Sequence, residues 1–582
     1  MSLVPQPWPE PAPQLVEAVA AMYRGKRERP LPVLVRDKLG EWLSDEQFVG
    51  AYGMRGKPGW PPSRLALVTI FQKAENLTDR QAAECVRTRI DWKYALGLDL
   101  ADPGFDHSVL SEFRSRVTAG GLDQVVLDTL LERLAEHGLV GAGATMRTDS
   151  THVISAVRDL NRLELAGESV RACLEQLVVA APQVVAQLLD DSWGTRYAAR
   201  VDTWRIPATA ARQHELALAY GRDGHTLLTA VYAAAASDPD LAFLAGLRQV
   251  EVLRVVLVQN YLTVTGEQGR EVITRREAEV EGLPPGRSRI ASPYDTDTRW
   301  GAKRDTFWNG YKVHVTETCD TAGPAHDSDG EGDGDDATAA PPHLIVNVET
   351  TDATVPDNQM TEPIHAHLGQ RGLLPGEHLL DSGYPSAELL VSSQTDYGIT
   401  LITPILADTS PQARAGAGFD RTAFAIDFDA QHATCPQGHT SSSWNPVTQR
   451  GTPTIVITFS KAGCGPCPVR ELCTTSASQR RQLTVHTREV HQAQLTARAA
   501  ADTKDFQARY ALRAGVEGTI RQGVAITGMR RARYRGLDKT RTEHTYAAVA
   551  LNLIRLSAWW NGHPLDRTRT SHLACLQLKQ AS

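Results

Sequence analysis

The order of strand-like and helix-like segments between residues 145 and 406 constrains the fold of this 582-residue chain more than any other feature. Short apolar or alternating runs predict strands, and longer runs with apolar residues three or four apart predict helices. In order, the segments are the strand TMRTDSTHVI (145–154), the strands GYKVHVTET (310–318) and HLIVNVETT (343–351), a helix around 360–369, the apolar strand in EHLLDSGY (377–384), the helix SAELLVSSQ (386–394) and the strand GITLITPIL (398–406). This order predicts an α/β fold with a mixed sheet.

The segments before, within and after this α/β region are too long to belong to a single hydrophobic core. A chain of this length exceeds what one hydrophobic core normally supports, so several domains or large insertions are expected. Helical periodicity dominates most of the remainder, and short alternating strands such as TIVITFS and RQLTVHT dominate one stretch. The predicted division is a helical N-terminal domain (1–140), an α/β core (141–160 and 293–407), a helical insertion (161–292), a β-rich insert (408–490) and a C-terminal helical part of the core (491–582).

Two helices in the N-terminal domain have clear signals. LTDRQAAECV begins with Thr78 and has Gln81 three positions later, the pattern of a capping box at a helix start. FDHSVLSEFRSRV is expected to leave Arg114 and Arg116 in solvent. Its core-facing residues are Val109, Leu110, Phe113 and Val117. The pattern fits a generic helical bundle or, alternatively, a helix-turn-helix reader of DNA.

Charge is distributed unevenly along the chain. The formal net charge of −7 argues against a uniformly basic coat, but residues 326–336 hold six acidic residues and predict a solvated loop. Residues 513–541 hold eight basic and two acidic residues, a net charge of +6. No apolar run reaches the roughly 18 residues of a membrane span, and the Pro-rich start lacks the layout of a signal peptide. We therefore expect a cytoplasmic protein without a membrane partner.

Four of the eight cysteines cluster in the β-rich insert, at Cys435, Cys464, Cys467 and Cys473. In a reducing compartment such a cluster indicates metal binding or plain burial rather than a disulfide framework. A Cys-x-x-Cys pair with two further soft ligands is able to close a tetrahedral Zn²⁺ site. The spacing departs from the paired Cys-x-x-Cys of a zinc ribbon, so structural zinc and unligated thiols both remain open.

Three acidic residues stand out by position. Asp149 lies inside the first strand of the α/β order, and Asp381 follows a later apolar strand directly, where α/β sheets usually present functional groups. Glu517 lies on a helix with Arg513 and Arg521 at four-residue spacing, beside an apolar stripe. Taken alone, that spacing fits an ordinary ladder of surface ion pairs.

The residues around these acids resemble a known family, the bacterial insertion-sequence transposases of the Asp-Asp-Glu (DDE) class, in a branch with a cysteine-containing insert before the Glu helix. The resemblance rests on TDSTHV (148–153), GYKVHVTETCD (310–320), NVETTDATVPDN (347–358), LLDSGYPSAELL (379–390), YALRAGVEGTIRQGV (510–524), GMRRARYRGLDKTRTEHTYAAVALNLIRL (528–556) and the N-terminal helices. One departure is Val524, where the family has a basic residue; Arg521 is the nearest substitute.

The resemblance implies an RNase H-like core in which Asp149, Asp381 and Glu517 are catalytic and bind Mg²⁺ or Mn²⁺. Carboxylates supply the hard oxygen ligands that Mg²⁺ prefers, and two such ions activate water and neutralise the reacting phosphate. Without a cation, two carboxylates 4 Å apart repel by about 4 kcal/mol at an effective dielectric near 20. We therefore expect the three acids to converge around divalent metal.

The resemblance also implies DNA as partner, with the terminal inverted repeats of the element and target DNA as substrates and the N-terminal domain as a DNA-binding part. Candidate DNA contacts are Tyr510, Arg513, Arg521, Arg530, Arg531, Arg533, Arg535 and Lys539. The basic strip offers salt-dependent affinity for phosphates. A nucleoid-associated homodimer is expected, because an element has two ends. Alternatives are an RNase H-like nuclease without strand transfer and an inactive DNA-binding repressor.

Overall fold

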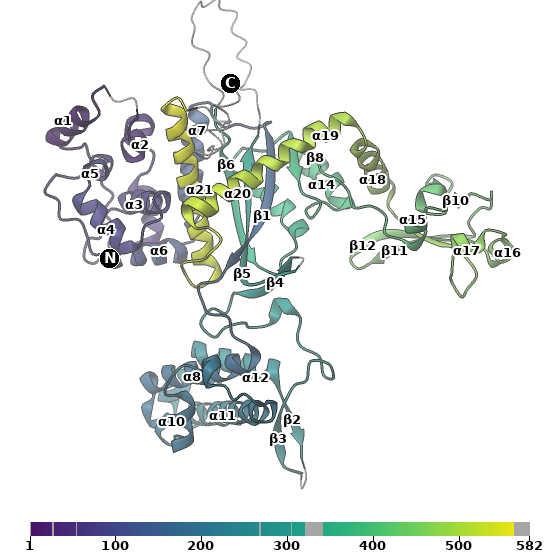
Figure 1. Cartoon of the computed structure of the whole chain (residues 1–582), viewed down its shortest axis with the longest axis horizontal. Helices are drawn as coiled ribbons and strands as arrows, with labels where there is room; N and C mark the ends of the chain where they lie inside the picture. Colours follow the sequence, from purple (N-terminus) through teal and green to yellow (C-terminus); the bar gives the residue numbers. More distant parts are fainter. Residues whose placement is uncertain are drawn as a thin grey trace, which may run out of the picture.

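A mixed sheet lies at the centre of the computed structural model, which describes residues 2–25, 28–53, 55–266, 269–303, 305–319 and 341–563. Within these residues the sheet has six strands (Figure 1). They are β1 (Thr145–Ile154), β4 (Arg299–Lys303), β5 (Thr306–Thr318), β6 (Ile345–Asp352), β7 (Glu377–Leu380) and β8 (Thr400–Ile402). β5 pairs antiparallel with β1 on one side and with β4 and β6 on the other, whereas β7 and β8 continue parallel to β1. The mixed α/β order expected from the sequence is confirmed; β4 was not anticipated.

Helices pack on both faces of this sheet. They are α13 (Thr361–Gln370), α14 (Ala387–Tyr397), α19 (Lys504–Ala511), α20 (Gly515–Thr527) and α21 (Leu537–Trp560). A further helix, α18 (Arg488–Ala501), packs on α14. Successive strand residues point to opposite faces. On β6, Thr350 bonds His544 of α21, whereas the neighbouring Glu349 contacts His367 of α13. α21 therefore covers one face and α13 the other.

The N-terminal helices pack beside α21 (Figure 1). They are α1 (Pro13–Met22), α2 (Leu31–Leu39), α3 (Pro62–Ala74), α4 (Asp79–Thr88), α5 (Ile90–Leu96), α6 (Ser108–Ala119) and α7 (Val125–Glu136). The capping box is confirmed: Thr78 Oγ1 accepts from the Gln81 amide, and the Gln81 side chain accepts from the Thr78 amide. Lys73 of α3 and Glu543 of α21 form a fully buried ion pair of 2.6 Å, which ties these helices to the core.

The expected exposure of Arg114 is wrong. Its side chain is only 7 % exposed, and its Nη2 lies 2.6 Å from Asp79 Oδ2. The guanidinium also lies over the ring of Tyr534, 4.6 Å from the centroid. Both partners come from other segments, so the helical pattern of FDHSVLSEFRSRV gives no sign of them. A buried guanidinium is tolerated here because a carboxylate and an aromatic face meet it.

Residues 161–292 form a helical unit with a separate core at one end of the sheet, below it in Figure 1. Its helices are α8 (Arg162–Ala180), α9 (Pro182–Ala186), α10 (Asp191–Tyr197), α11 (Ala210–Ser237) and α12 (Arg248–Asn260). α12 ends at Asn260, inside the insertion that was expected to be helical. An unanticipated hairpin follows, β2 (Tyr261–Thr265) with β3 (Glu271–Arg275). Tyr261 anchors it by donating to the Ala217 carbonyl of α11, a contact that sequence pattern does not reveal.

The cysteine-containing segment projects away from the sheet on the opposite side to the N-terminal helices (Figure 1). Its elements are α15 (Pro411–Ala415), β9 (Ala425–Asp427), β10 (His432–Thr434), β11 (Ser443–Gln449), β12 (Thr452–Thr458), α16 (Lys461–Cys464), α17 (Arg470–Cys473) and β13 (Gln482–His486). Its buried apolar core is small, built around Ile457, Phe459 and Leu483. The acidic stretch 326–336 and Cys575 lie outside the described residues. None of the helices described is both long and apolar enough to cross a bilayer.

Candidate active site

Asp149 and Asp381 lie at the same level on neighbouring parallel strands. The register pairs Thr148 of β1 with Leu380 of β7, so each acid is the next residue after a paired one. Neighbouring strands are about 4.8 Å apart, which brings the two backbones close. Each carboxylate accepts a hydrogen bond from the following backbone amide, at 2.7 Å from Ser150 and at 2.8 Å from Ser382. The sheet thus orients both acids by the same local contact.

Arg513 joins Asp149 to Glu517. Arg513 lies in the 3-10 turn Leu512–Ala514 that precedes α20, and Glu517 lies in the first turn of α20. Arg513 Nη1 is 3.2 Å from Asp149 Oδ2, and Nη2 is 2.7 Å from Glu517 Oε1. The Asp149 and Arg513 side chains are each 14 % exposed, whereas Glu517 is 62 % exposed. The third acid therefore lies at the open side of the site.

The site is electrostatically strained around Asp149. Burial raises the pKa of Asp149, and the charge of Asp381 adds to that rise, against the hydrogen bond from Ser150 and the charges of Arg513 and Lys303. Burial lowers the pKa of Arg513, but Asp149, Tyr510, Asp381 and the hydrogen bond to Glu517 together outweigh burial and raise it. A buried carboxylate beside a second one is the environment in which a bound cation gains most. The two aspartates therefore lie on paired strands, and the charge of Asp381 acts on Asp149.

The donors suit a hard divalent cation in type, since all three are carboxylates. In the described part of the chain, however, no three His, Cys, Asp and Glu side chains lie together as metal ligands. The guanidinium of Arg513 stands between Asp149 and Glu517 and supplies the positive charge there. The residue types therefore fit the ion, whereas their present arrangement, with Arg513 between Asp149 and Glu517, does not form a ligand group.

A buried charge network behind the site holds α20 against the sheet. Glu317 of β5 is fully buried and contacts Arg147 of β1 at 2.7 Å and Arg555 of α21 at 2.8 Å. Thr519 of α20 donates to the same carboxylate at 2.6 Å. Arg147 also donates to the Leu512 carbonyl at 2.6 Å, in the turn that carries Arg513. This network was not predicted from the sequence, where its one sign was a glutamate and an arginine inside predicted strands.

A second missed residue is Asp357, which follows β6. Its carboxylate lies 2.8 Å from Lys312 Nζ of β5 and 3.3 Å from the Ser150 hydroxyl, next to Asp149. A Cβ at Gly383, two residues after Asp381, would lie 3.3 Å from Asp357 Oδ2. Asp357 therefore contacts residues beside both aspartates. The sequence placed it in the family-like motif NVETTDATVPDN but assigned it no role.

The predicted DNA-contacting residues fall into two groups. Arg521, Arg530, Arg531, Arg535 and Lys539 are exposed. Others are held by protein contacts: Arg533 bonds Asn76 and the Leu77 carbonyl, and Tyr510 stacks on Phe506. Tyr534, in the middle of the basic strip, is largely buried beneath Arg114, and burial raises its pKa to about 12. The exposed group is the part of the strip that is accessible to a ligand.

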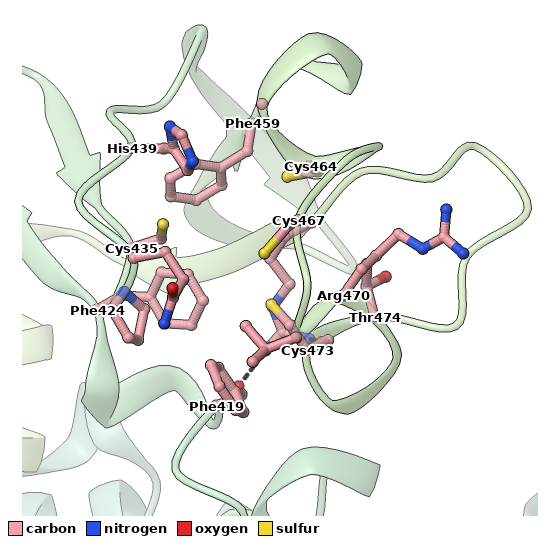
Figure 2. Close-up of a pocket in the computed structure, with 15 residues that line it drawn as sticks. Phe419, Phe424, Cys435, His439, Phe459, Cys464, Cys467, Arg470, Cys473 and Thr474 are labelled. Atoms are coloured by element: carbon pink, nitrogen blue, oxygen red, sulfur yellow. Dashed lines mark hydrogen bonds between the residues drawn. The ribbon is translucent and has the colours of Figure 1, made fainter.

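The four clustered cysteines lie far from these acids, in the projecting segment (Figure 1). Cys435, Cys464, Cys467 and Cys473 are free thiols that line one small cavity together with His439 (Figure 2). The cluster expected from the sequence therefore exists in space, separate from the candidate active site.

Comparison with known proteins gives two matches. Residues 434–557 match the family described as Transposase DDE domain, and residues 21–116 match the Transposase domain (DUF772). The first segment contains Glu517 and the cysteine cluster, whereas Asp149 and Asp381 lie outside both. No curated protein and no solved structure matches the chain. Both family matches support the resemblance of the chain to the DDE transposases of insertion sequences.

Proposed function

We propose that this transposase cleaves the ends of its own element and joins them to target DNA with Asp149, Asp381 and Glu517 as catalytic residues. The observation that carries the proposal is the register of β1 and β7, which sets the two aspartates side by side, with Arg513 linking Asp149 to Glu517. The order of strands supports an RNase H-like core: an antiparallel hairpin on one side of β1 and two parallel strands on the other.

The three carboxylates would hold Mg²⁺ or Mn²⁺, which supplies an activated nucleophile and charge neutralisation at the phosphate. The chain's own residues prepare that site. Backbone amides of Ser150 and Ser382 orient the aspartates, and the Glu317 network fixes the base of α20. Arg513 balances the charge of Asp149 and Glu517 in the free protein and would be able to contact a phosphate of bound DNA.

The exposed basic residues after α20 would bind the DNA backbone beside this site. Arg530 links this basic surface to the candidate active site, because its Nε donates to Thr151 of β1 at 2.8 Å, and Thr151 is two residues from Asp149. In this proposal residues 1–140 bind the element end, residues 141–160, 293–407 and 491–582 form the catalytic core, and residues 161–292 and 408–490 are insertions into it. A homodimer brings the two terminal inverted repeats together.

The test is cleavage of a duplex that carries the DNA flanking the gene, with Mg²⁺, followed by joining to a plasmid. Asp149→Asn keeps the side-chain size and removes the charge. It should lower cleavage by more than about 100-fold, since loss of even an outer-shell partner of a metal costs 10–100-fold, while DNA binding persists. The matched control is Asp505→Asn, an acid of α19 that is 84 % exposed, which should cut normally.

The outcomes separate the alternatives. Cleavage without joining would indicate a nuclease, and binding without cleavage by the unaltered chain would indicate a repressor. Normal cleavage by the Asp149→Asn chain would remove Asp149 from the catalytic set.

A further inference from the structure

We propose that the projecting β-rich segment contains a structural Zn²⁺ site whose ligands are the thiolates of Cys435, Cys464, Cys467 and Cys473. This site is independent of the candidate active site and of the reaction proposed there. Nothing in the two family matches assigns a metal to these residues.

The backbone brings the four cysteines together from three separate segments. Cys435 follows β10 and opens a tight turn closed by the Gly438 amide, 2.8 Å from the Cys435 carbonyl. Cys464 ends α16 and opens a second turn, closed by the Cys467 amide at 3.3 Å. Cys473 ends α17. Figure 2 shows the sulfurs of all four around one space. Two cysteine-bearing turns and a helix end thus border the same cavity.

The four thiols line a small cavity. Its volume is about 20 Å³, on the scale of the roughly 10–15 Å³ that holds one water molecule. Four soft ligands in a closed site are the usual set for structural Zn²⁺. Phe419, Phe424 and Phe459 line the same cavity and give it an apolar wall.

A buried cation beside the cavity matches the charge of such a site. Four thiolates around one Zn²⁺ carry a net charge of −2. Arg481 lines the cavity, is only 9 % exposed, and donates to the Cys473 carbonyl at 2.9 Å. Its buried Nε has no hydrogen-bond partner among the described residues. A buried guanidinium with a free donor is costly unless an anion is near, and a tetrathiolate site supplies that anion.

The segment also needs a crosslink. Its apolar core is small, and β11 is largely exposed, so little hydrophobic burial holds the two cysteine turns in place. As the side chains stand, no three potential ligands in the described residues converge as a metal site. Binding therefore couples release of thiol protons to side-chain rotations that draw the sulfurs inward.

The experiment uses the full chain, purified under reducing conditions without chelator. Elemental analysis should find one Zn²⁺ per chain, in the absence of DNA and of added Mg²⁺. Replacement by Co²⁺ should give the visible and near-ultraviolet absorption of a tetrahedral thiolate site. Cys435→Ser and Cys467→Ser should each lose the metal, whereas Cys85→Ser, a half-buried thiol in α4, should keep it.

Folding of the variants does not limit the test, because the unaltered chain provides a second measurement. Removal of the metal by a chelator should make residues 408–490 sensitive to protease, and added Zn²⁺ should restore protection. Less than a tenth of an equivalent of Zn²⁺ with unchanged proteolysis would overturn the proposal. Loss of zinc with His439→Ala and its retention with Cys473→Ser would overturn the four-thiolate set. A failed DNA cleavage assay has no bearing on either result.

Discussion

Replacing the buried Glu317 by glutamine should loosen the helix that carries Glu517. Glu317 is the shared acceptor of Arg147, Arg555 and Thr519, and glutamine keeps its size while removing its charge. The two arginine side chains are only 8 % and 13 % exposed, so water does not replace the lost partner. Removing one member of a buried ion pair costs about 3–5 kcal/mol. We take the lower end, about 3 kcal/mol, because glutamine still accepts one hydrogen bond.

The effect should appear locally, since the chain has several cores and a single free energy of unfolding is not well defined for it. A loss of about 3 kcal/mol raises the opening equilibrium by about a hundredfold, at 1.4 kcal/mol per factor of ten. Hydrogen exchange of α20 (Gly515–Thr527) should accelerate by that factor, with α4 unchanged. The control is Glu132→Gln, an exposed acid of α7. Unchanged exchange in α20 would refute the assigned role of the network.

Lowering the pH should remove the stabilisation that the Glu317 carboxylate provides. The pKa of Glu317 is lowered, because Arg555 and Arg147 outweigh the opposing effect of burial. A group with a depressed folded pKa stabilises the protein above its unfolded pKa, about 4.3 for glutamate, and loses that contribution as the pH falls further. The free energy of opening α20, measured by hydrogen exchange, should therefore differ between the unaltered chain and Glu317→Gln by a constant amount above about pH 5. This difference should shrink below about pH 4.

Three further outcomes are expected. Thr78→Ala removes the cap of α4 and should cost about 1 kcal/mol, read as faster hydrogen exchange of α4; unchanged exchange would deny the capping box a role in stability. Lys73→Met leaves Glu543 buried and unpaired and should cost about 3–5 kcal/mol, so protease should release the N-terminal helices sooner than in an Arg87→Met control. Arg531→Ala should reduce the salt dependence of DNA affinity by about one phosphate contact, whereas Arg533→Ala should mainly destabilise the fold; equal salt slopes for both would contradict the division of the basic strip.

Most of the fold was predictable because its signals are local. The bounds of the first strand, Thr145–Ile154, and the cap at Thr78 depend on residues a few positions apart. The position of Asp381 after an apolar run is also local. The hairpin after Asn260 was not predicted, because the hydrogen bond that anchors it runs from Tyr261 of β2 to Ala217 of the distant helix α11. Arg114 was misplaced for the same reason.

The contacts of Arg513 with Asp149 and Glu517 were not predictable from the sequence. They change the reason for expecting a divalent cation at this site. From the sequence, repulsion among three acids demanded a cation. In the structure Arg513 already contacts two of them, so their proximity alone does not require Mg²⁺. The stronger reason is Asp149, whose pKa remains raised by burial and by Asp381 despite Arg513. Arg513 therefore does not offset the burial of Asp149. Under the proposed function, a divalent cation would gain most beside the two aspartates, whose positions are set by the strand register.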